Sequence, residues 1–331
     1  FTQNWLSNNK NKIAQLIVQA REVNKFHGTF LSSIMKYQVN GRIHGEIQQL
    51  RSDSGGTVSG RLSMSNPNLQ QVPARNKDFG PKIRSLFIPE EGYKWGSFDY
   101  SQQEPRMTVH YAASIGDGYE GSNELVEAYH NTEADFHQTV ADLVGIERSQ
   151  AKTIGLGLMY GMGKNKLALS LGVSKDEADQ LIVKYNNKVP FVKKLSDRCK
   201  FAADEKGVIR TKKGRKCRFD MWETKDFGLH VAEKFDDAVA KYGKDNIKRA
   251  YTYKALNRLI QGSSADQTKQ AMLDCYNQGH LPMLQIHDEL CFNIKDDNHA
   301  NEIKKIMENA IEFKVPSVVD KGIGESWGDA K

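Results

Sequence analysis

The sequence predicts an α+β fold in which one sheet is completed by strands from distant parts of the chain. A strand is expected at 93–99, and two apolar runs within 283–294 are typical of a tight hairpin. A long helix-rich segment lies between them and extends to about residue 275. Because strands stand on both sides of this segment, the sheet must join parts of the chain that are far apart in sequence.

The remaining elements follow from apolar spacing and from turn residues. Residues 51–73 are rich in Gly, Ser, Asn and Pro and are predicted to be largely irregular. A last helix is expected near 298–312, and no internal repeat is present. Residues 11–36 are predicted to be helical from the spacing of Ile13, Leu16, Ile17, Ala20 and Val23.

Composition narrows the class of protein. The 331 residues carry a formal net charge of +6, which suits a polyanionic partner but equally suits a mildly basic solvated surface. No run of about eighteen apolar residues occurs, so we expect no membrane span. Four widely spaced cysteines without a CxxC pair favour a reduced, cytoplasmic protein without structural zinc. The chain begins with neither a Met nor a signal peptide, so we expect a fragment of a longer protein.

Acidic residues stand at the ends of two predicted strands. The hairpin tip carries His287, Asp288 and Glu289, and Asp99 ends the strand at 93–99. Adjacent acids near a core repel each other unless a cation neutralises them. If the two strands are neighbours, Asp99 and Asp288 converge into a set of oxygen ligands that suits Mg²⁺. Two such ions about 3.5–4 Å apart can activate an attacking oxygen and stabilise a leaving oxygen.

A helix start is predicted just after Asp99. Ser101 and Glu104 form an S-x-x-E pattern, which is typical of a capping box. On this pattern alone, Glu104 is a capping residue and has no role in binding.

The segment 147–163 predicts a helix with a basic face. Arg148, Lys152, Leu156 and Tyr160 follow at steps of four residues, so the face changes from cationic to apolar to aromatic. A nucleoside triphosphate has a matching order of groups, from the charged phosphates through the sugar to the flat base. An ordinary amphipathic helix with two solvated cations is the alternative. The glycines of this segment argue against that alternative, because each glycine in a helix costs about 1 kcal/mol and suggests close approach by a neighbour or ligand.

Taken together, these segments resemble the family A DNA polymerases. Five or more motifs occur in the family's order, and the resemblance runs from about residue 20 to the end. The three central motifs are "DYSQQEPR" (99–106), "RSQAKTIGLGLMYG" (148–161) and "IHDEL" (286–290). Further matches are "GRLSMSNPNLQQVPARN" (60–76), "NRLIQGSSAD" (257–266) and "GIGESWGDAK" (322–331).

The resemblance implies a right-hand architecture with an antiparallel-sheet palm, helical fingers and a truncated thumb. Residues 1–50 would be a thumb remnant, 51–106 and 251–331 the palm, and 107–250 the fingers. The implied activity is template-directed addition of dNTPs to a primer 3′ end by two-metal phosphoryl transfer, with pyrophosphate release, in DNA replication or repair. No exonuclease motif is visible, so no proofreading is expected. The implied partners are DNA primer-template and dNTPs. We expect a monomer, with an upstream exonuclease domain or processivity factor in the full protein.

The resemblance also implies roles for individual residues. The catalytic residues would be Asp99, Lys152, Asp288 and Glu289, and two Mg²⁺ ions would be bound by Asp99, Asp288 and the carbonyl of Tyr100. The dNTP would be bound by Gln102, Glu104, His137, Arg148, Lys152, Leu156 and Tyr160, with Glu104 closing the space that a ribose 2′-hydroxyl needs. The primer-template would be bound by Arg61, Asn68, Gln70, Arg75, Asn257, Gln261 and His287.

Some positions depart from the family pattern. Leu156 stands where the family has Phe or Tyr, which leaves the response to dideoxynucleotides open. Tyr253 replaces an Arg of the bacterial enzymes, and Gln103 and Pro105 replace apolar residues in a variant that looks phage-like. A single-subunit RNA polymerase shares the palm and two-metal chemistry, but Glu104 and the "HDE" sequence favour the DNA enzyme. A noncatalytic template-binding module is disfavoured because both aspartates and both triphosphate cations are present.

Overall fold

The computed structural model describes residues 1–50, 55–73, 76, 78–131, 135–226, 228 and 230–330. The helices are α1 (Gln3–Asn8), α2 (Lys12–Lys25), α3 (Ser33–Met35), α4 (Gly80–Arg84), α5 (Gln103–Ala113), α6 (Ser122–Asn131), α7 (Phe136–Val144), α8 (Arg148–Met159), α9 (Lys164–Leu171), α10 (Lys175–Lys188), α11 (Pro190–Lys206), α12 (Phe235–Tyr242), α13 (Ala255–Asn277) and α14 (Asp297–Glu308). A π-helical segment, Phe26–Ser32, joins α2 to α3.

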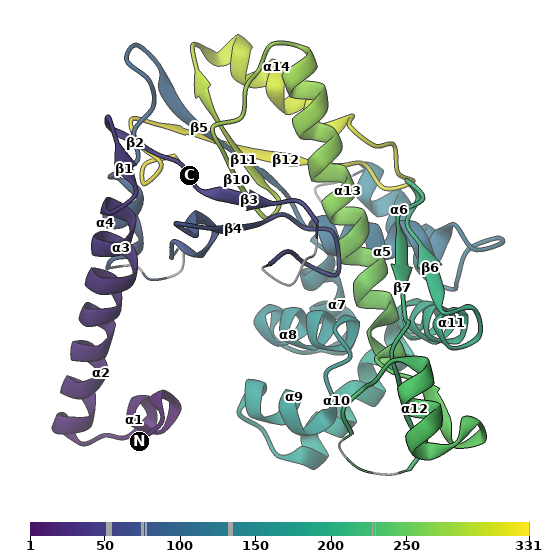
Figure 1. The fold of residues 1–331 in the computed structure, drawn as a ribbon. Coiled ribbons are helices and arrows are strands. Elements are labelled where there is room, and N and C mark those ends of the chain that lie inside the picture. Colours follow the sequence, from purple (N-terminus) through teal and green to yellow (C-terminus); the bar gives the residue numbers. More distant parts are fainter. Residues whose placement is uncertain are drawn as a thin grey trace.

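The strands are β1 (Gln38–Val39), β2 (Arg42–Ile43), β3 (Glu46–Gln48), β4 (Ser63–Ser65), β5 (Lys94–Tyr100), β6 (Val208–Arg210), β7 (Lys216–Arg218), β8 (Trp222–Thr224), β9 (Ile247–Arg249), β10 (Leu284–Ile286), β11 (Glu289–Ile294) and β12 (Val319–Gly324). Four of them form an antiparallel sheet in the order β10-β11-β5-β12, and the rest pair as two-stranded ribbons. The α+β prediction is therefore confirmed, since the central sheet joins segments nearly 200 residues apart (Figure 1).

The hairpin prediction is confirmed in detail. Strands β10 and β11 pair with Ile286 opposite Glu289, which leaves a two-residue turn at His287 and Asp288. A two-residue turn requires unusual backbone angles, and His287 accordingly has a left-handed φ of 57°. The turn thus fixes both the register of the hairpin and the position of its acids.

Side-chain alternation divides the central sheet into two faces. Phe98, Tyr100, Leu290 and Phe292 lie on the face that packs against α13 and α14. Trp95 and Cys291 lie on the opposite face, in a cluster with Phe30 and Trp327. Asp99 and Glu289 alternate in register with the second set, so they lie on the face away from α13 and α14.

A second and larger core joins the helices between β5 and α13. Val109 of α5, Phe136 of α7, Ile154 of α8, Tyr185 of α10 and Leu256 of α13 are all buried in it. The N-terminal half of α13 packs in this core, whereas Ala271 and Cys275 in its C-terminal half pack against the sheet. Helices α7 to α10 lie below the sheet in Figure 1. The helix-rich middle of the chain is confirmed, although the ribbons β6–β7 and β8–β9 within it were not predicted.

The N-terminal helix is confirmed, but its apolar face is not buried. Ile13, Leu16 and Val23 are exposed by half or more, while Phe26 and Phe30 at the other end of the segment enter the core. Figure 1 shows α2 extending away from the sheet. Its spacing therefore predicted a helix and did not identify a packing partner.

Two further predictions concerned the cysteines and membrane-spanning segments. All four cysteines are buried free thiols. None of the helices in the described residues is long and apolar enough to cross a membrane.

Candidate functional site

Three carboxylates form a row across the central sheet. Asp99 of β5 is directly opposite Glu289 of β11 on one side and Asp320 of β12 on the other. Directly opposed residues of antiparallel strands have Cβ atoms about 4.5–5.5 Å apart, so these like charges are close. Sequence reasoning placed Asp99 and Glu289 together, but it missed Asp320.

Asp288 lies at the turn next to this row. Its carbonyl accepts a 3.4 Å hydrogen bond from the N–H of Tyr100, the residue after Asp99. The pKa of Asp99 is raised to about 7, first by burial and then by the charges of Asp288, Glu289 and Asp320 in that order. The pKa of Asp288 is also raised, first by burial and then by the charge of Glu104. The structure therefore brings Asp99 and Asp288 close together, as the sequence predicted.

Two arginines balance part of this negative charge. The guanidinium of Arg84 on α4 lies 4.2 Å from the ring centroid of Trp327, and the charges of Glu289 and Asp99 act on it. Burial is the largest influence on Arg84 and lowers its pKa. Arg61 opposes the rise in the pKa of Asp288. Arg84 was not among the predicted residues, because nothing near it in the sequence indicates acidic neighbours.

Glu104 is held by two residues from outside its own helix. Its Oε1 accepts from Nη2 of Arg61 at 2.7 Å, and its Oε2 accepts from the hydroxyl of Tyr160 at 2.5 Å. Burial and the charge of Glu104 raise the pKa of Tyr160, so its hydroxyl keeps the proton that it donates. Gln261 also bonds to this hydroxyl. Arg61, Glu104, Tyr160 and Gln261 form one cluster.

The capping-box prediction is wrong. Helix α5 begins at Gln103, close to the expected start, but its N-cap is Gln102 and no side chain caps it. The N–H of Ser101 donates instead to the carbonyl of Val318, at 2.8 Å. The carboxylate of Glu104 is taken by Arg61 and Tyr160, since two charge-assisted hydrogen bonds outweigh one local cap.

Helix α8 presents the predicted face. Arg148 and Lys152 are exposed, Leu156 is half-buried and Tyr160 is exposed just beyond the end of the helix. The glycines allow close approach by neighbours. A Cβ on Gly155 would lie 3.3 Å from the hydroxyl of Tyr185, and a Cβ on Gly157 would lie 3.2 Å from Sδ of Met162. The expected close approach therefore comes from the protein's own side chains.

The N-terminus of α7 meets this face. Asp135 caps α7 and accepts from Nε of Arg148 at 2.7 Å. Burial alone would raise the pKa of Asp135, but hydrogen bonds from Arg148 and two backbone N–H groups lower it. His137 is buried, and its Nδ1 has no hydrogen-bond partner among the described residues. The pKa of His137 is lowered to about 4, mainly by burial and in addition by the charges of Lys152 and Arg148, so the imidazole is neutral near these two cations.

Gln102 connects the sheet to α7. Its backbone has a left-handed φ of 51°, and its Oε1 accepts from the N–H of Phe136 at 2.9 Å. The side chain thus lies at the α7 terminus near His137. Gln103, unusual for its motif, is buried and donates to Oε1 of Gln267 at 2.9 Å, which explains how a polar residue is tolerated there.

The predicted primer-template residues lie around the turn and on α13. Gln70 donates to Oε1 of Gln285 on β10 at 2.9 Å, and Asn68 accepts from the N–H of Gln70. Asn257 and Gln261 are half-buried one turn apart on α13, and His287 is exposed at the hairpin turn. Arg75 lies outside the described residues.

The acidic row fits a hard divalent cation. Among the residues that the structure describes, no group of three or more His, Cys, Asp or Glu side chains is arranged as a complete metal site. Mg²⁺ does not need one, since it takes one or two carboxylates and completes its shell with waters and phosphates. Asp99 and Asp288 supply such a pair, and their raised pKa values indicate that a cation would relieve their repulsion.

Comparison with known proteins gives one consistent answer. The family model of DNA polymerase family A matches residues 3–329. A DNA-directed DNA polymerase of Pseudomonas phage M6 is 40% identical over 96% of this chain and 51% of its own length. DNA polymerase I of Pseudomonas aeruginosa is 30% identical over 96% of this chain and 34% of its own length. This chain thus spans about half or less of these relatives.

A solved structure agrees with the sequence relatives. The POL domain of Pol1 from M. smegmatis, in complex with DNA primer-template and dNTP, matches with a TM-score of 0.78 and 27% identity. The match covers 99% of this chain and 55% of that chain. With the family model matching nearly end to end, this chain belongs to DNA polymerase family A.

Proposed function

We propose that this chain is a template-directed DNA polymerase that adds dNTPs to a primer 3′ end and releases pyrophosphate. The observation that supports this most directly is the meeting of Asp99 and Asp288 where the inner strands β5 and β11 adjoin. We call this end of the sheet, with Asp99, Asp288, Glu289 and Asp320, the acidic edge. That edge lies beside the Arg61–Glu104–Tyr160 cluster, which leads to the cationic face of α8. Acids for metal ions and cations for phosphates are thus present on adjoining elements.

Asp99 and Asp288, with the carbonyl of Tyr100, would hold two Mg²⁺ ions. When bound, the ions would lower the pKa of the primer 3′-hydroxyl and neutralise charge on the leaving pyrophosphate. The carboxylates would fix the positions of the two ions, because the register of the sheet and the turn hold these carboxylates in place before substrate arrives. Glu289 would be an accessory acid, and the hydrogen bond from Nε1 of Trp327 at 3.4 Å orients it.

The fingers residues would bind the triphosphate. Arg148 and Lys152 carry the charge, and the buried neutral His137 has Nδ1 without a partner among the described residues. Gln102, Leu156 and Tyr160 would complete the contacts to the nucleotide. Because phosphoryl transfer depends on positioning and charge stabilisation, Lys152 near the leaving group would contribute to the rate.

Glu104 would exclude ribonucleotides. Arg61 and Tyr160 bind its two carboxylate oxygens, so the side chain is fixed where a 2′-hydroxyl would clash or be desolvated. The minor groove presents acceptors at similar positions in every base pair, so donors such as Arg61 and Gln261 can check pair geometry. Asn68, Gln70, Arg75, Asn257 and His287 would add contacts to the primer-template.

The phage and bacterial relatives support a role in DNA replication or repair in the bacterial cytoplasm. The relative solved with primer-template and dNTP supports these substrates. We propose that the chain acts as a monomer without proofreading of its own. A single-subunit RNA polymerase is the alternative, and separate assays with dNTPs and rNTPs distinguish the two.

Primer extension by Asp288→Ala tests the proposal. We expect no extension in Mg²⁺ and nearly unchanged binding of a primer-template duplex, because the carboxylate serves the metal ions and contributes little to duplex affinity. Asp197→Ala removes an exposed acid of α11 and is the matched control. Extension by Asp288→Ala at the control rate would contradict the assignment of the metal site.

A further inference from the structure

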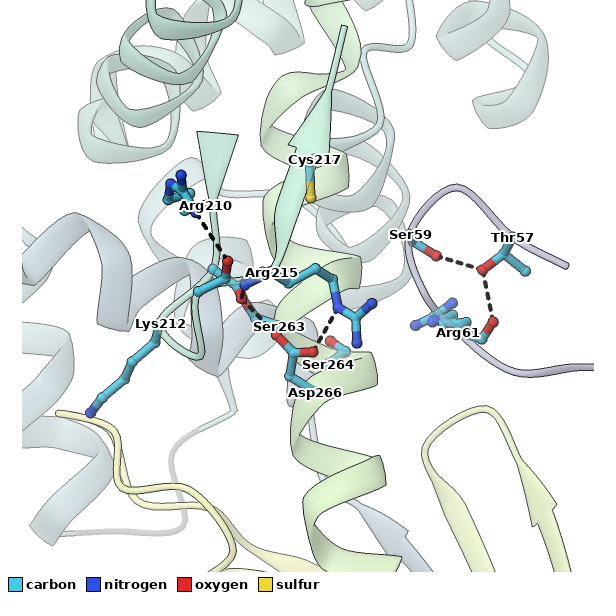
Figure 2. A network of polar contacts seen from close by, with 12 residues as sticks. Thr57, Ser59, Arg61, Arg210, Lys212, Arg215, Cys217, Ser263, Ser264 and Asp266 are labelled. Atoms are coloured by element: carbon cyan, nitrogen blue, oxygen red, sulfur yellow. Dashed lines mark hydrogen bonds and ion pairs between the residues drawn. The ribbon is translucent and has the colours of Figure 1, made fainter. Parts of the chain in front are cut away.

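The tip of the β6–β7 hairpin is anchored to α13 by a buried aspartate. Both carboxylate oxygens of Asp266 accept hydrogen bonds of 2.6 Å, Oδ2 from the hydroxyl of Thr211 and Oδ1 from Nε of Arg215 (Figure 2). The Thr211 hydroxyl in turn accepts from the N–H of Arg215 at 3.1 Å. Asp266 is 8% exposed, so this pairing compensates a charge that water does not reach.

The same arginine supports the loop at 57–61. Gly60 has a left-handed φ of 84°, and a Cβ built on it would lie 2.4 Å from Nη1 of Arg215. The guanidinium therefore lies directly against the backbone of this loop. On the α13 side, a Cβ on Gly262 would lie 3.2 Å from Cγ2 of Thr211 and 3.4 Å from the carbonyl of Ser59. Glycine at both positions lets loop, hairpin and helix pack at contact distance.

The next residue of the loop is Arg61. Its carbonyl accepts from the hydroxyl of Thr57 at 2.8 Å, and Thr57 and Ser59 are joined by a 3.3 Å hydrogen bond. The loop is thus closed on itself and can transmit a displacement of Gly60 to Arg61. From Arg61 the path continues through the 2.7 Å ion pair to Glu104.

We propose that Arg215, anchored by Asp266, is a positioning residue for sugar selection. It supports Gly60, so that Arg61 holds Glu104 at the place where a ribose 2′-hydroxyl would enter. Arg215 does not touch the nucleotide in this scheme and acts through Arg61. The inference rests on the proposed function, in which Glu104 limits the space beside the sugar.

The hairpin supplies a well-matched set of variants. Arg215→Gln removes the charge and the planar group that faces Gly60, whereas Arg215→Lys keeps the charge for Asp266 and loses the fork geometry. Lys216→Ala removes a neighbouring exposed cation that contacts neither Asp266 nor Gly60. The measured quantity is kcat/KM for a dNTP divided by kcat/KM for the matching rNTP. Both values come from one preparation, so a loss of folded enzyme cancels in the ratio.

We expect Arg215→Gln to lower this selectivity about fivefold to tenfold, a change of the size of one ordinary hydrogen bond, because Arg215 acts on Glu104 only through Arg61. Arg215→Lys should recover part of it, and Lys216→Ala should match the unmodified protein. In a Glu104→Ala background, Arg215→Gln should produce no further loss, since the two act through one group.

Three results would overturn the inference. If Glu104→Ala loses selectivity while Arg215→Gln keeps it, the positioning role is wrong and the role of Glu104 stands. If Arg215→Gln lowers the melting temperature and both kcat/KM values equally, the contact serves the fold alone. If Glu104→Ala keeps full selectivity, the proposed sugar exclusion fails and the role of Arg215 fails with it.

Discussion

The acidic edge of the sheet and the cationic face of α8 are built in opposite ways. Asp99, Glu289 and Asp320 are fixed by backbone pairing on three adjacent strands, and burial together with the neighbouring acidic charges raises the pKa of Asp99. Arg148 and Lys152 project from a single helix into solvent, and Arg148 is held by an ion pair with the partly exposed Asp135. One site is rigid and electrostatically unfavourable before substrate binds, and the other is adaptable and unstrained.

The proposed mechanism explains why the two sites differ in rigidity. Metal ions in phosphoryl transfer must stand at fixed positions, so the carboxylates that hold them gain from a rigid sheet. A triphosphate arrives and leaves in every cycle, so its cations gain from freedom to change partners. Surface ion pairs of the Arg148–Asp135 kind are worth about 1 kcal/mol or less, which leaves Arg148 ready to exchange Asp135 for a phosphate.

The largest expected effect is at Asp99. Replacing Asp99 with Asn should lower kcat for primer extension by about a thousandfold or more, because a neutral amide binds Mg²⁺ weakly. The same variant should be more stable than the unmodified protein without metal at pH 8. A stabilised but inactive Asp99→Asn would establish that the edge trades stability for function, and an active variant would remove Asp99 from the metal site.

The pH dependence of this stabilisation has a definite sign. The folded-state pKa of Asp99 is raised to about 7, so the folded protein keeps a proton that the unfolded chain releases above pH 4. Stability without metal should therefore decline as the pH rises from about 4 to 7. At pH 8 in EDTA, Asp99→Asn should raise the free energy of unfolding by about 1 kcal/mol, because solvent screens the partly exposed Asp99, and the melting temperature should rise with it. At pH 4 both should change little. Mg²⁺ should stabilise the unmodified protein at pH 8 and leave Asp99→Asn unaffected.

The contrast between the two sites also explains what the sequence could reveal. The face of α8 follows from the four-residue spacing of Arg148, Lys152 and Leu156, which any helix converts into proximity. The sheet edge required more, because Asp99 and Asp288 meet only through pairing of distant strands. Acids at strand ends suggested that pairing, and the motif resemblance supported it.

Residues whose position depends wholly on tertiary packing were missed. Asp320 lies in the segment "VDKGIG", whose two glycines and mixed charges do not predict a strand. The segment is nevertheless a strand, which pairs with β5. Arg84 belongs to a five-residue helix, and its acidic neighbours are contributed by β5 and β11. The capping-box error has the same origin, since Arg61 and Tyr160 are 43 and 56 residues from Glu104 in sequence.

The cations of α8 provide the next largest effect. Lys152→Ala should reduce kcat/KM for dNTP incorporation by about a hundredfold, the loss expected for a charge that acts on the transferred phosphate. Arg148→Ala should cost about tenfold, mainly in KM, since Asp135 competes for it before substrate binds. Single-turnover kinetics separate the two parameters. Equal losses in both variants would show that the cations of this face are interchangeable.

Leu156 offers a gain-of-function test of the adaptable site. Leu156→Phe introduces the aromatic ring that the resemblance implies for this position, and stacking of an aromatic side chain is worth about 0.5–1.5 kcal/mol. We expect KM for dNTPs to fall by about threefold to tenfold, with kcat little changed. The position is half-buried, so Leu156→Ile is the control for a change of shape without a ring. An unchanged KM in Leu156→Phe would mean that the nucleotide does not reach this turn of α8.

The smallest expected effect returns to the sheet. Asp320 is opposite Asp99 and raises its pKa, but it lies on the side away from the Asp288 turn. Asp320→Asn should therefore leave the maximal rate of extension intact and move the acidic limb of the pH–rate profile down by about half a pH unit, since one like charge is removed across two strands. The profile is measured at saturating Mg²⁺ between pH 5.5 and 8.5. A loss of the maximal rate comparable to that of Asp99→Asn would make Asp320 part of the metal site itself, and the distinction between neighbouring charge and ligand would then have to be redrawn.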